Sequence, residues 1–431
     1  MPLKKRDDNW IDGLRGAASF IVVTGHLCTA FVPYLHSPAL SENGPMSLWQ
    51  LPFFRLCVSG RAAVAVFFTI TGFVNSLNPV KNARNNNFQT ALTNLARSTF
   101  TRSGRLVIPT SIATIIGWFL CQIGAFKLAR RVDAEWIRNG GHDPDPFGES
   151  LLKLLRSLTV YWTSGGGEYD ATNWTLVYFL QGSFRVYLAL LAMTLVTPRF
   201  WRIISAFLYV YAWVTGDYLV GINLYAGILL AQLHVDYGYR ATSLVPKVVP
   251  SLLMILGLFL WSFPLDNPHW ALWSLVTRDF FLAITPLFTD TNRYCVSVGT
   301  TLLMLGIFFS KNARKFLTSR LFNFLGRVSF PVYLLHNTVI RTILVLMVYG
   351  PNASKTPITD GQGNLVEVQR IRPMGFIFII PVFYAVLYLV AYSWTLYIDP
   401  LCAHAVDWMK NKMFVEEQQP LEKLAPLTGV V

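Results

Sequence analysis

The sequence predicts an all-α fold: a polytopic transmembrane helix bundle of about ten spans, with both termini on the cytoplasmic side. Composition, charge-free windows and the alternation of basic loops predict it. Hydrophobic residues make up 53% of the 431 residues, charged residues only 14%, and the mean hydropathy is +0.43. Soluble domains carry about 25% charged residues, and so few charges could not cover a soluble surface. The composition therefore excludes disorder, coiled coils, fibrous repeats and most soluble enzymes.

The candidate spans are apolar windows near the length of about 20 residues that a helix needs to cross about 30 Å of hydrocarbon. Windows free of Asp, Glu, Lys and Arg are Gly16–Ser41, Ala62–Val80, Leu106–Phe126, Tyr218–Val235, Val248–Leu265, Tyr294–Ser310 and Pro373–Ile398. Windows that are short or hold one Arg are Asn173–Pro198, Ile203–Gly216 and Val328–Tyr349. The segment Trp270–Phe288 carries Arg278 and Asp279 at its centre, so we expect it to be re-entrant or interfacial.

The net charge of +13 comes from basic loops at alternate ends of these windows. With the N-terminus in the cytoplasm, the second cytoplasmic segment holds five basic residues without an acid, and the Lys311–Arg327 block is also purely basic. The segment Lys127–Ala171 on the other side is mixed in sign. This is the pattern of the positive-inside rule. We therefore expect a lipid bilayer, not nucleic acid, as the partner of this charge.

The organisation expected along the chain is a cytoplasmic N-terminal segment (residues 1–12), a transmembrane domain (13–400) and a cytoplasmic tail (401–431). The apolar run from Gly16 fits a signal anchor in a multi-pass protein of an endomembrane or the plasma membrane. The five cysteines form no CxxC pair, and no HExxH or Cys/His spacing indicates a metal site.

Two polar residues at membrane depth are the first candidates for chemistry. His26 follows Arg15 by eleven positions, which on a helix brings both to one face, about 16 Å apart along the axis. Buried ionisable groups are costly, so each is a functional hypothesis by default. The alternative is a snorkelling arginine below a histidine that bonds a neighbouring helix.

A second pair, Arg102 and Arg105, lies on one helical face at the cytoplasmic start of the third span. Two guanidiniums there could form bidentate bonds to phosphates. Taken alone, ordinary positive-inside anchoring is the stronger explanation of the pair. Arg185 and Arg341 are further cations inside predicted spans, and we expect them to bind an anionic group or backbone carbonyls.

Several segments together resemble the acyltransferase-3 family of membrane acyltransferases. They are Asp12-Gly-Leu-Arg-Gly16 with Arg15-x10-His26, Gly60-Arg-Ala-Ala-Val-Ala-Val-Phe-Phe-Thr-Ile-Thr-Gly-Phe73, Arg102-Ser-Gly-Arg105 and Ser329-Phe-Pro-Val-Tyr-Leu-Leu-His336. Asn173-Trp-Thr-Leu and Gln181-Gly-Ser resemble the corresponding segment of fungal members. The segments fall in the family's order between residues 12 and 336.

The resemblance implies transfer of an acyl group, usually acetyl from acetyl-CoA, to a hydroxyl of a small molecule or carbohydrate. Acyl-CoA would be a co-substrate, and no cofactor would be bound permanently. His26 would be the general base, because a hydroxyl needs one near neutral pH. Arg15 would position the donor, and Arg102 and Arg105 would hold the CoA phosphates.

Three further residues are candidate contacts of the reacting groups. Thr71 and Tyr333 are candidate hydroxyl donors to the developing oxyanion. His336 lies three residues after Tyr333, on the same helical face, and is either a second polar contact of the substrate or a satisfied interhelical bond. A direct transfer and a two-step transfer through His26 both fit this set.

One position departs from the family. Phe179 stands where many members carry a glutamate, and Glu168 and Asp170 are candidate substitutes. This departure keeps open the hypothesis of a catalytically inactive relative. A membrane transporter is the competing class, but the halves of the sequence show no related pattern and buried carboxylates are scarce. The fungal resemblance favours secondary-metabolite biosynthesis as the setting.

Overall fold

The computed structural model describes residues 9–140, 142–287 and 289–414. This part of the chain is helical and contains two isolated bridges but no β-strand, which confirms the all-α prediction. The basic residues Lys4, Lys5 and Arg6 and the end of the predicted tail, residues 415–431, lie outside the described residues. The helix that ends the described chain runs unbroken through the predicted boundary at residue 400.

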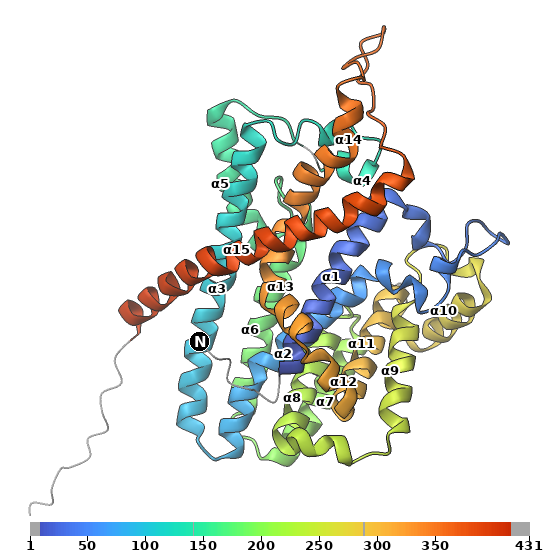
Figure 1. The fold of residues 1–431 in the computed structure, drawn as a ribbon. Coiled ribbons are helices and arrows are strands. Elements are labelled where there is room, and N and C mark those ends of the chain that lie inside the picture. The colour runs from blue at the N-terminus through green and yellow to red at the C-terminus, as the bar shows by residue number, and fades with distance from the viewer. Residues whose placement is uncertain (1–8, 141, 288, 415–431) are drawn as a thin grey trace, which may run out of the picture.

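Ten helices correspond to the ten predicted windows (Figure 1). They are α1 (Asn9–Phe31), α2 (Gly60–Arg84), α3 (Phe88–Gln122), α6 (Leu176–Met193), α7 (Pro198–Val214), α8 (Gly221–Tyr237), α9 (Val248–Trp261), α11 (Thr291–Phe309), α13 (Arg320–Val339) and α15 (Pro373–Met413). The remaining elements are η1 (Pro33–His36), η2 (Leu48–Gln50), η3 (Phe54–Val58), η4 (Ala129–Arg131), α4 (Glu135–Arg138), α5 (Phe147–Thr163), η5 (Ala171–Thr175), η6 (Gly238–Ser243), η7 (Pro268–Trp270), α10 (Leu272–Ile284), α12 (Lys311–Leu317), η8 (Ile340–Leu344) and α14 (Val345–Ala353).

Seven spans within the described residues are long and apolar enough to cross a bilayer. They contain α1, α2, α3, α6, α11, α13 with α14, and α15. The helices α7, α8 and α9 have only 17, 17 and 14 residues, and the α8–η6 segment bends from α9 by 117°. The exact count of ten spans therefore stays a prediction. At 13 residues α10 is too short to span, as expected of the segment with Arg278 and Asp279.

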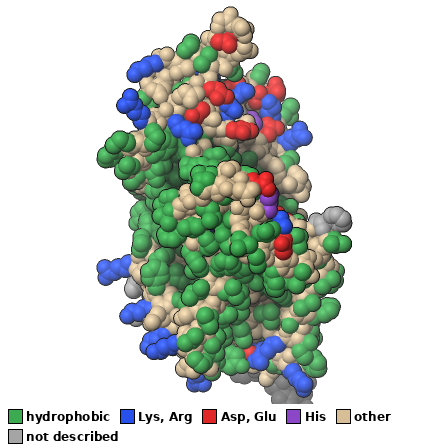
Figure 2. Space-filling view, turned by 90° about the vertical axis from the view of Figure 1, so that its right-hand side faces the viewer, with side chains coloured by type: hydrophobic (Ala, Val, Ile, Leu, Met, Phe, Trp, Pro, Cys, Tyr) green, Lys and Arg blue, Asp and Glu red, His purple; other side chains and the backbone are tan. Residues whose placement is uncertain are grey.

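Most charged side chains gather at the two ends of the bundle, and the band between them is hydrophobic except for a small patch with charged and histidine side chains at one side (Figure 2). We call the end that carries α4, α5 and α14 the upper end, and the end where α2 joins α3 the lower end (Figure 1). On the face drawn in Figure 2, acidic side chains concentrate at the upper end, while the lower end is mainly basic. This distribution of charge is that of an integral membrane protein.

Close backbone contacts between helices set the shape of the core. A Cβ on Gly16 would lie 2.5 Å from the backbone nitrogen of Gly326, so α1 and α13 touch backbone to backbone. A Cβ on Gly72 would lie 2.2 Å from the carbonyl oxygen of Leu224, which brings α2 against α8 in the same way. Small residues at such crossings are typical of membrane helix packing.

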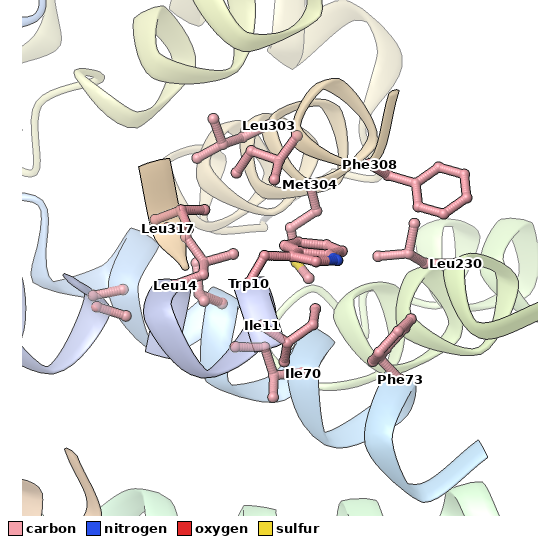
Figure 3. Packing of buried hydrophobic residues seen from close by; sticks show 14 of the residues in the cluster. Trp10, Ile11, Leu14, Ile70, Phe73, Leu230, Leu303, Met304, Phe308 and Leu317 are labelled. Atoms are coloured by element: carbon pink, nitrogen blue, oxygen red, sulfur yellow. The ribbon is translucent and has the colours of Figure 1, made fainter. Parts of the chain in front are cut away.

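The lower half of the core is built around Trp10, which is fully buried at the start of α1 (Figure 3). Its indole packs among apolar side chains of α2, α8 and α11, including Phe73, Leu230 and Met304. Packing of Trp10 therefore fixes α1 at its lower end. The positions of the candidate site residues Arg15 and His26, further along α1, depend on this packing.

Replacing Gly72 by Ala is expected to destabilise the protein by about 1–3 kcal/mol, because the new methyl group would overlap the carbonyl of Leu224. The melting temperature of the purified protein in detergent measures the effect. Gly361→Ala is the matched control, because a Cβ there meets nothing within 4 Å. Equal melting temperatures for the two variants would contradict the close α2–α8 contact.

Candidate active site

A cavity of about 330 Å³ lies where α1, α2, α3, α6, α13 and α15 come together. Its lining includes five of the seven site residues that the sequence predicts. These are Arg15, Thr71, Arg102, Arg105 and Tyr333. Since three of the five are arginines, we call this space the guanidinium cavity. The structure thus brings together residues that are up to 318 positions apart in the chain.

The arginines of α1 and α3 are held by few protein partners. Arg15 donates from Nη2 to the carbonyl of Gly326 at 2.9 Å, and the same nitrogen lies 3.2 Å from a carboxylate oxygen of Asp12. Arg102 donates from Nε to the hydroxyl of Ser183 at 3.3 Å. A guanidinium has five N–H donors, so both arginines keep donors for a ligand.

The third arginine, Arg105, is exposed and forms no hydrogen bond or ion pair with any described residue. One carboxylate, Asp399 on α15, also lines the cavity. Even with Asp12 beside Arg15 counted, three guanidiniums against two carboxylates leave an excess of positive charge in a half-enclosed space. Coulomb attraction to an anion is stronger there than in bulk water. The cavity is therefore suited to a ligand that carries several negative charges.

Three aromatic rings line the cavity on the side of the upper end. The ring centroid of Phe179 lies 6.3 Å from that of Phe67 and 6.5 Å from that of Tyr333, both in edge-to-face geometry. Phe179 is only 9% exposed and also packs against Phe68 at 4.6 Å. We call Phe67, Phe179 and Tyr333 the aromatic wall. The position where many members of the resembled family carry a glutamate is therefore part of an apolar partition in this chain.

The two predicted histidines lie beyond the aromatic wall and do not line the cavity. The ring of His336 is 6.1 Å from that of Tyr333 and stacks on His26 at 5.2 Å. His26 is half-buried and stacks on its other face against Trp136 of α4 at 4.9 Å. The sequence therefore placed His26 above Arg15 but gave no sign of the aromatic rings between the arginines and the histidines.

The hydrogen bonds of His336 indicate which of its nitrogens is basic. Nδ1 donates to the carbonyls of Tyr333 at 2.8 Å and Val332 at 3.2 Å, which assigns the proton to Nδ1. Nε2 is buried and has no hydrogen-bond partner among the described residues. The pair His26–His336 therefore offers at least one nitrogen lone pair that is not used by the protein itself.

A buried carboxylate stands next to this pair. Asp170 is 5% exposed, and its Oδ1 accepts hydrogen bonds from Asn337 Nδ2 at 2.6 Å and from the backbone N–H and hydroxyl of Thr172 at 2.8 and 2.6 Å. Its Oδ2 has no partner within the described part of the chain. Because Asn337 directly follows His336, the negative charge lies on the histidine side of the aromatic wall.

The two cations that the sequence places inside spans have different partners. Arg185 forms an ion pair with Asp217 at 2.7 Å. Arg341 lies in η8, a π-helical turn, where it donates to the carbonyl of Gly140 at 2.5 Å and covers the ring of Trp136 at 5.7 Å. Wide turns of this kind often occur at functional sites. The π-helical turn directs the buried guanidinium of Arg341 toward Trp136, whose ring stacks on His26.

The segment after α4 also contains a histidine, His142, whose ring lies 6.4 Å from that of Tyr169. Burial, together with the nearby Arg341 charge, lowers the pKa of His142 below its ordinary value. This imidazole is therefore neutral near neutral pH and adds no positive charge to the segment that follows α4.

The two predicted oxyanion donors are already hydrogen-bonded. Thr71 donates to the carbonyl of Phe67 at 2.9 Å, and Tyr333 donates to the carbonyl of Thr172 at 2.7 Å. The Tyr333 hydroxyl also contacts that of Thr175 at 2.7 Å. Either hydroxyl would have to exchange its partner before it could donate to an oxyanion.

Comparison with known proteins agrees with this arrangement. A family model described as an acyltransferase domain matches residues 8–398. The chain belongs to the acyltransferase-3 family. As a member it is an enzyme that transfers acyl groups other than aminoacyl groups, and the family resemblance of the sequence motifs is confirmed.

Three fungal relatives are similar to this acyltransferase. It is 25% identical over 369 residues to the O-acetyltransferase PaAT-1 of Phomopsis amygdali, covering 78% of this chain and 72% of that protein. It is 24% identical over 395 residues to acyltransferase R4 of Phoma sp. and 24% identical over 400 residues to acyltransferase clz18 of Cochliobolus lunatus. Each of these two matches covers 78% of this chain and 83% of the relative. No solved structure matches the acyltransferase.

Sequence reasoning missed two contributors to the site. Trp136 stacks on His26 from a short helix in a polar segment, and nothing in its surroundings distinguishes it from other loop tryptophans. Asn337 bonds Asp170, and its place beside His336 was the one available signal. Of the two candidate substitutes for the family glutamate, the structure places Asp170 beside the histidines. The Glu168 side chain makes no hydrogen bond with a described residue.

Replacing Asp170 by Ala is expected to destabilise this acyltransferase by about 3 kcal/mol or more, because it leaves the buried donors of Asn337 and Thr172 without their acceptor. The melting temperature in detergent should fall clearly. Glu168→Ala is the matched control and should melt close to the wild type. If both variants melt alike, the buried polar cluster does not stabilise the fold.

Proposed function

We propose that this protein moves an acyl group, most simply acetyl, from acyl-CoA to a hydroxyl of a small molecule or carbohydrate, with His26 as general base. The observation that carries the proposal is the guanidinium cavity, where Arg15, Arg102 and Arg105 converge beneath the aromatic wall. Coenzyme A joins several phosphate charges to a long thin arm that ends in the thioester. A basic cavity that ends at an apolar partition matches both parts of that molecule.

The donor would bind with its phosphates on the arginines. Arg102 and Arg105 supply the charge-assisted hydrogen bonds, and Arg15 positions the pantetheine arm from the facing helix. The thioester would then pass between the rings of the aromatic wall toward His336 and His26. Such a passage needs a movement of the Phe179 or Tyr333 side chain, because these rings lie between the cavity and the histidines.

In the chemical step His26 removes the proton of the acceptor hydroxyl as its oxygen attacks the thioester carbonyl. The carbon–oxygen bond of the ester forms, the carbon–sulfur bond breaks, and the proton passes to the departing CoA thiolate. Asp170 stabilises the positive charge that develops on the stacked imidazoles, the role that a carboxylate next to a catalytic histidine performs. A two-step route would carry the acyl group on His26 before the acceptor receives it.

The topology of the proposal has ten spans, with the lower end and both termini in the cytoplasm. The basic lower end and the mixed charge of the upper end support this orientation. Acyl-CoA would then reach Arg105 from the cytoplasm. The acceptor would approach the histidines from the upper end, beside Trp136 and α4.

The acceptor class is supported by the relatives. PaAT-1 is named an O-acetyltransferase, which favours an oxygen acceptor and an acetyl donor. The other two relatives are named acyltransferases and are fungal as well. A hydroxyl-bearing small molecule of secondary metabolism therefore fits this chain best.

His26→Ala is expected to abolish transfer of label from radiolabelled acetyl-CoA in membranes that contain the protein, while the amount of protein stays unchanged. Removal of a general base costs about 10²- to 10⁴-fold in rate. His269→Ala, at an exposed histidine of η7, is the control and should keep full activity. Wild-type activity in the His26 variant would refute His26 as the base.

Arg105→Gln is expected to raise the KM for acetyl-CoA about tenfold with little change in kcat, because it removes a phosphate contact that is equally strong before and during the reaction. Raising the salt concentration should raise the KM of the wild type for acetyl-CoA toward that of the variant, because salt screens the charge pair. Arg320→Gln, at an exposed position on α13 that does not line the cavity, is the control. An unchanged KM in Arg105→Gln would contradict the assignment of the cavity to the donor phosphates.

A further inference from the structure

A second hollow of about 800 Å³ lies at the lower end, next to the guanidinium cavity. Val74 of α2 borders both spaces, so the two are neighbours along one helix. From Val74 the lining continues down the same face of α2 through Asn78, Lys81 and Asn85, at the spacing of successive helical turns. The hollow therefore continues the guanidinium cavity toward the lower end along a polar face of α2.

The charge of this hollow is positive. Asp236 is the one carboxylate among its lining residues, and it is held by Arg84 at 2.9 Å and by Arg202 at 2.6 Å. Two guanidiniums thus neutralise this one acid and leave a surplus. His234 lines the hollow as well and contacts the rings of Phe73 and Phe308.

Lys81 is the charged side chain of this hollow that is available to a ligand. It is exposed at the hollow and forms no hydrogen bond or ion pair with any residue that the structure describes. An ammonium is a compact point charge, suited to a single phosphate monoester. The exposed amides of Asn78 and Asn85 lie one turn to either side and offer further hydrogen bonds.

The two spaces follow one another along α2. Asn75 lines the guanidinium cavity, and Lys81, which lines the second hollow, follows it by six residues, a rise of about 9 Å along the helix. In coenzyme A part of one nucleoside separates the diphosphate from the ribose 3′-phosphate. A diphosphate on Arg102 and Arg105 would therefore direct the nucleotide into the second hollow.

We infer that the hollow at Lys81 is the subsite for the adenosine 3′-phosphate end of the acyl donor. This inference rests on the proposed function, because it extends the donor site of the same reaction. It assigns Lys81 to the 3′-phosphate and the polar face of α2 to the adenosine. The pantetheine arm then runs upward past Thr71 to the aromatic wall.

The test compares acetyl-CoA with acetyl-3′-dephospho-CoA, which lacks only the 3′-phosphate. The wild-type enzyme should show a KM for the dephospho donor about threefold to tenfold higher, the range expected for one partly exposed charge pair. In Lys81→Gln the two donors should give nearly equal KM values, both close to that of the wild type with the dephospho donor. Lys311→Gln, at an exposed lysine of α12 outside both spaces, should keep the wild-type preference.

The outcomes separate the subsite from the reaction. Acetyl transfer in which Lys81→Gln keeps the full preference for the 3′-phosphate overturns the subsite and leaves the proposed function intact. A wild type that uses both donors equally well also overturns it. A wild type that transfers no acetyl group from either donor overturns the proposed function, and the subsite with it.

Discussion

The close contact between α1 and α13 fixes the geometry of the whole site. Because Gly16 and Gly326 leave no room for side chains, the two backbones touch, and the Gly326 carbonyl comes within hydrogen-bonding distance of Arg15. About 16 Å further along the same two helices, His26 stacks on His336. One pair of rigid helices thus sets the distance between the guanidinium of Arg15 and the stacked histidines.

The aromatic wall gives the site two compartments with opposite character. Below it the guanidinium cavity is positive and accessible to an anionic donor. Above it the buried His336 and the half-buried His26 lie on the same side as the buried carboxylate of Asp170. A glutamate at the position of Phe179 would place negative charge in the wall itself. In this chain the wall is apolar, and the carboxylate of Asp170 lies beyond it on the side of the histidines.

Much of this arrangement can be predicted from the sequence, for physical reasons. Apolar windows and basic loops report the bilayer directly, so all ten helices are found where the composition predicts them. Local spacing also places Arg15 below His26 and pairs Arg102 with Arg105. The partners that come from distant segments leave no such trace. Trp136 reaches His26 across the fold, and the π-helical turn at Arg341 depends on tertiary packing that no local propensity encodes.

The last helix connects this chemistry to the lipid. Only 17% of the apolar window of α15 is buried within the protein, yet its lower part supplies Asp399, Cys402 and Ala403 to the wall of the guanidinium cavity. In Figure 1 it crosses the bundle obliquely instead of standing within it. A bilayer of different thickness changes the tilt of such a helix. The membrane itself is therefore a structural component of the guanidinium cavity, and its thickness and fluidity help to set the width of that cavity.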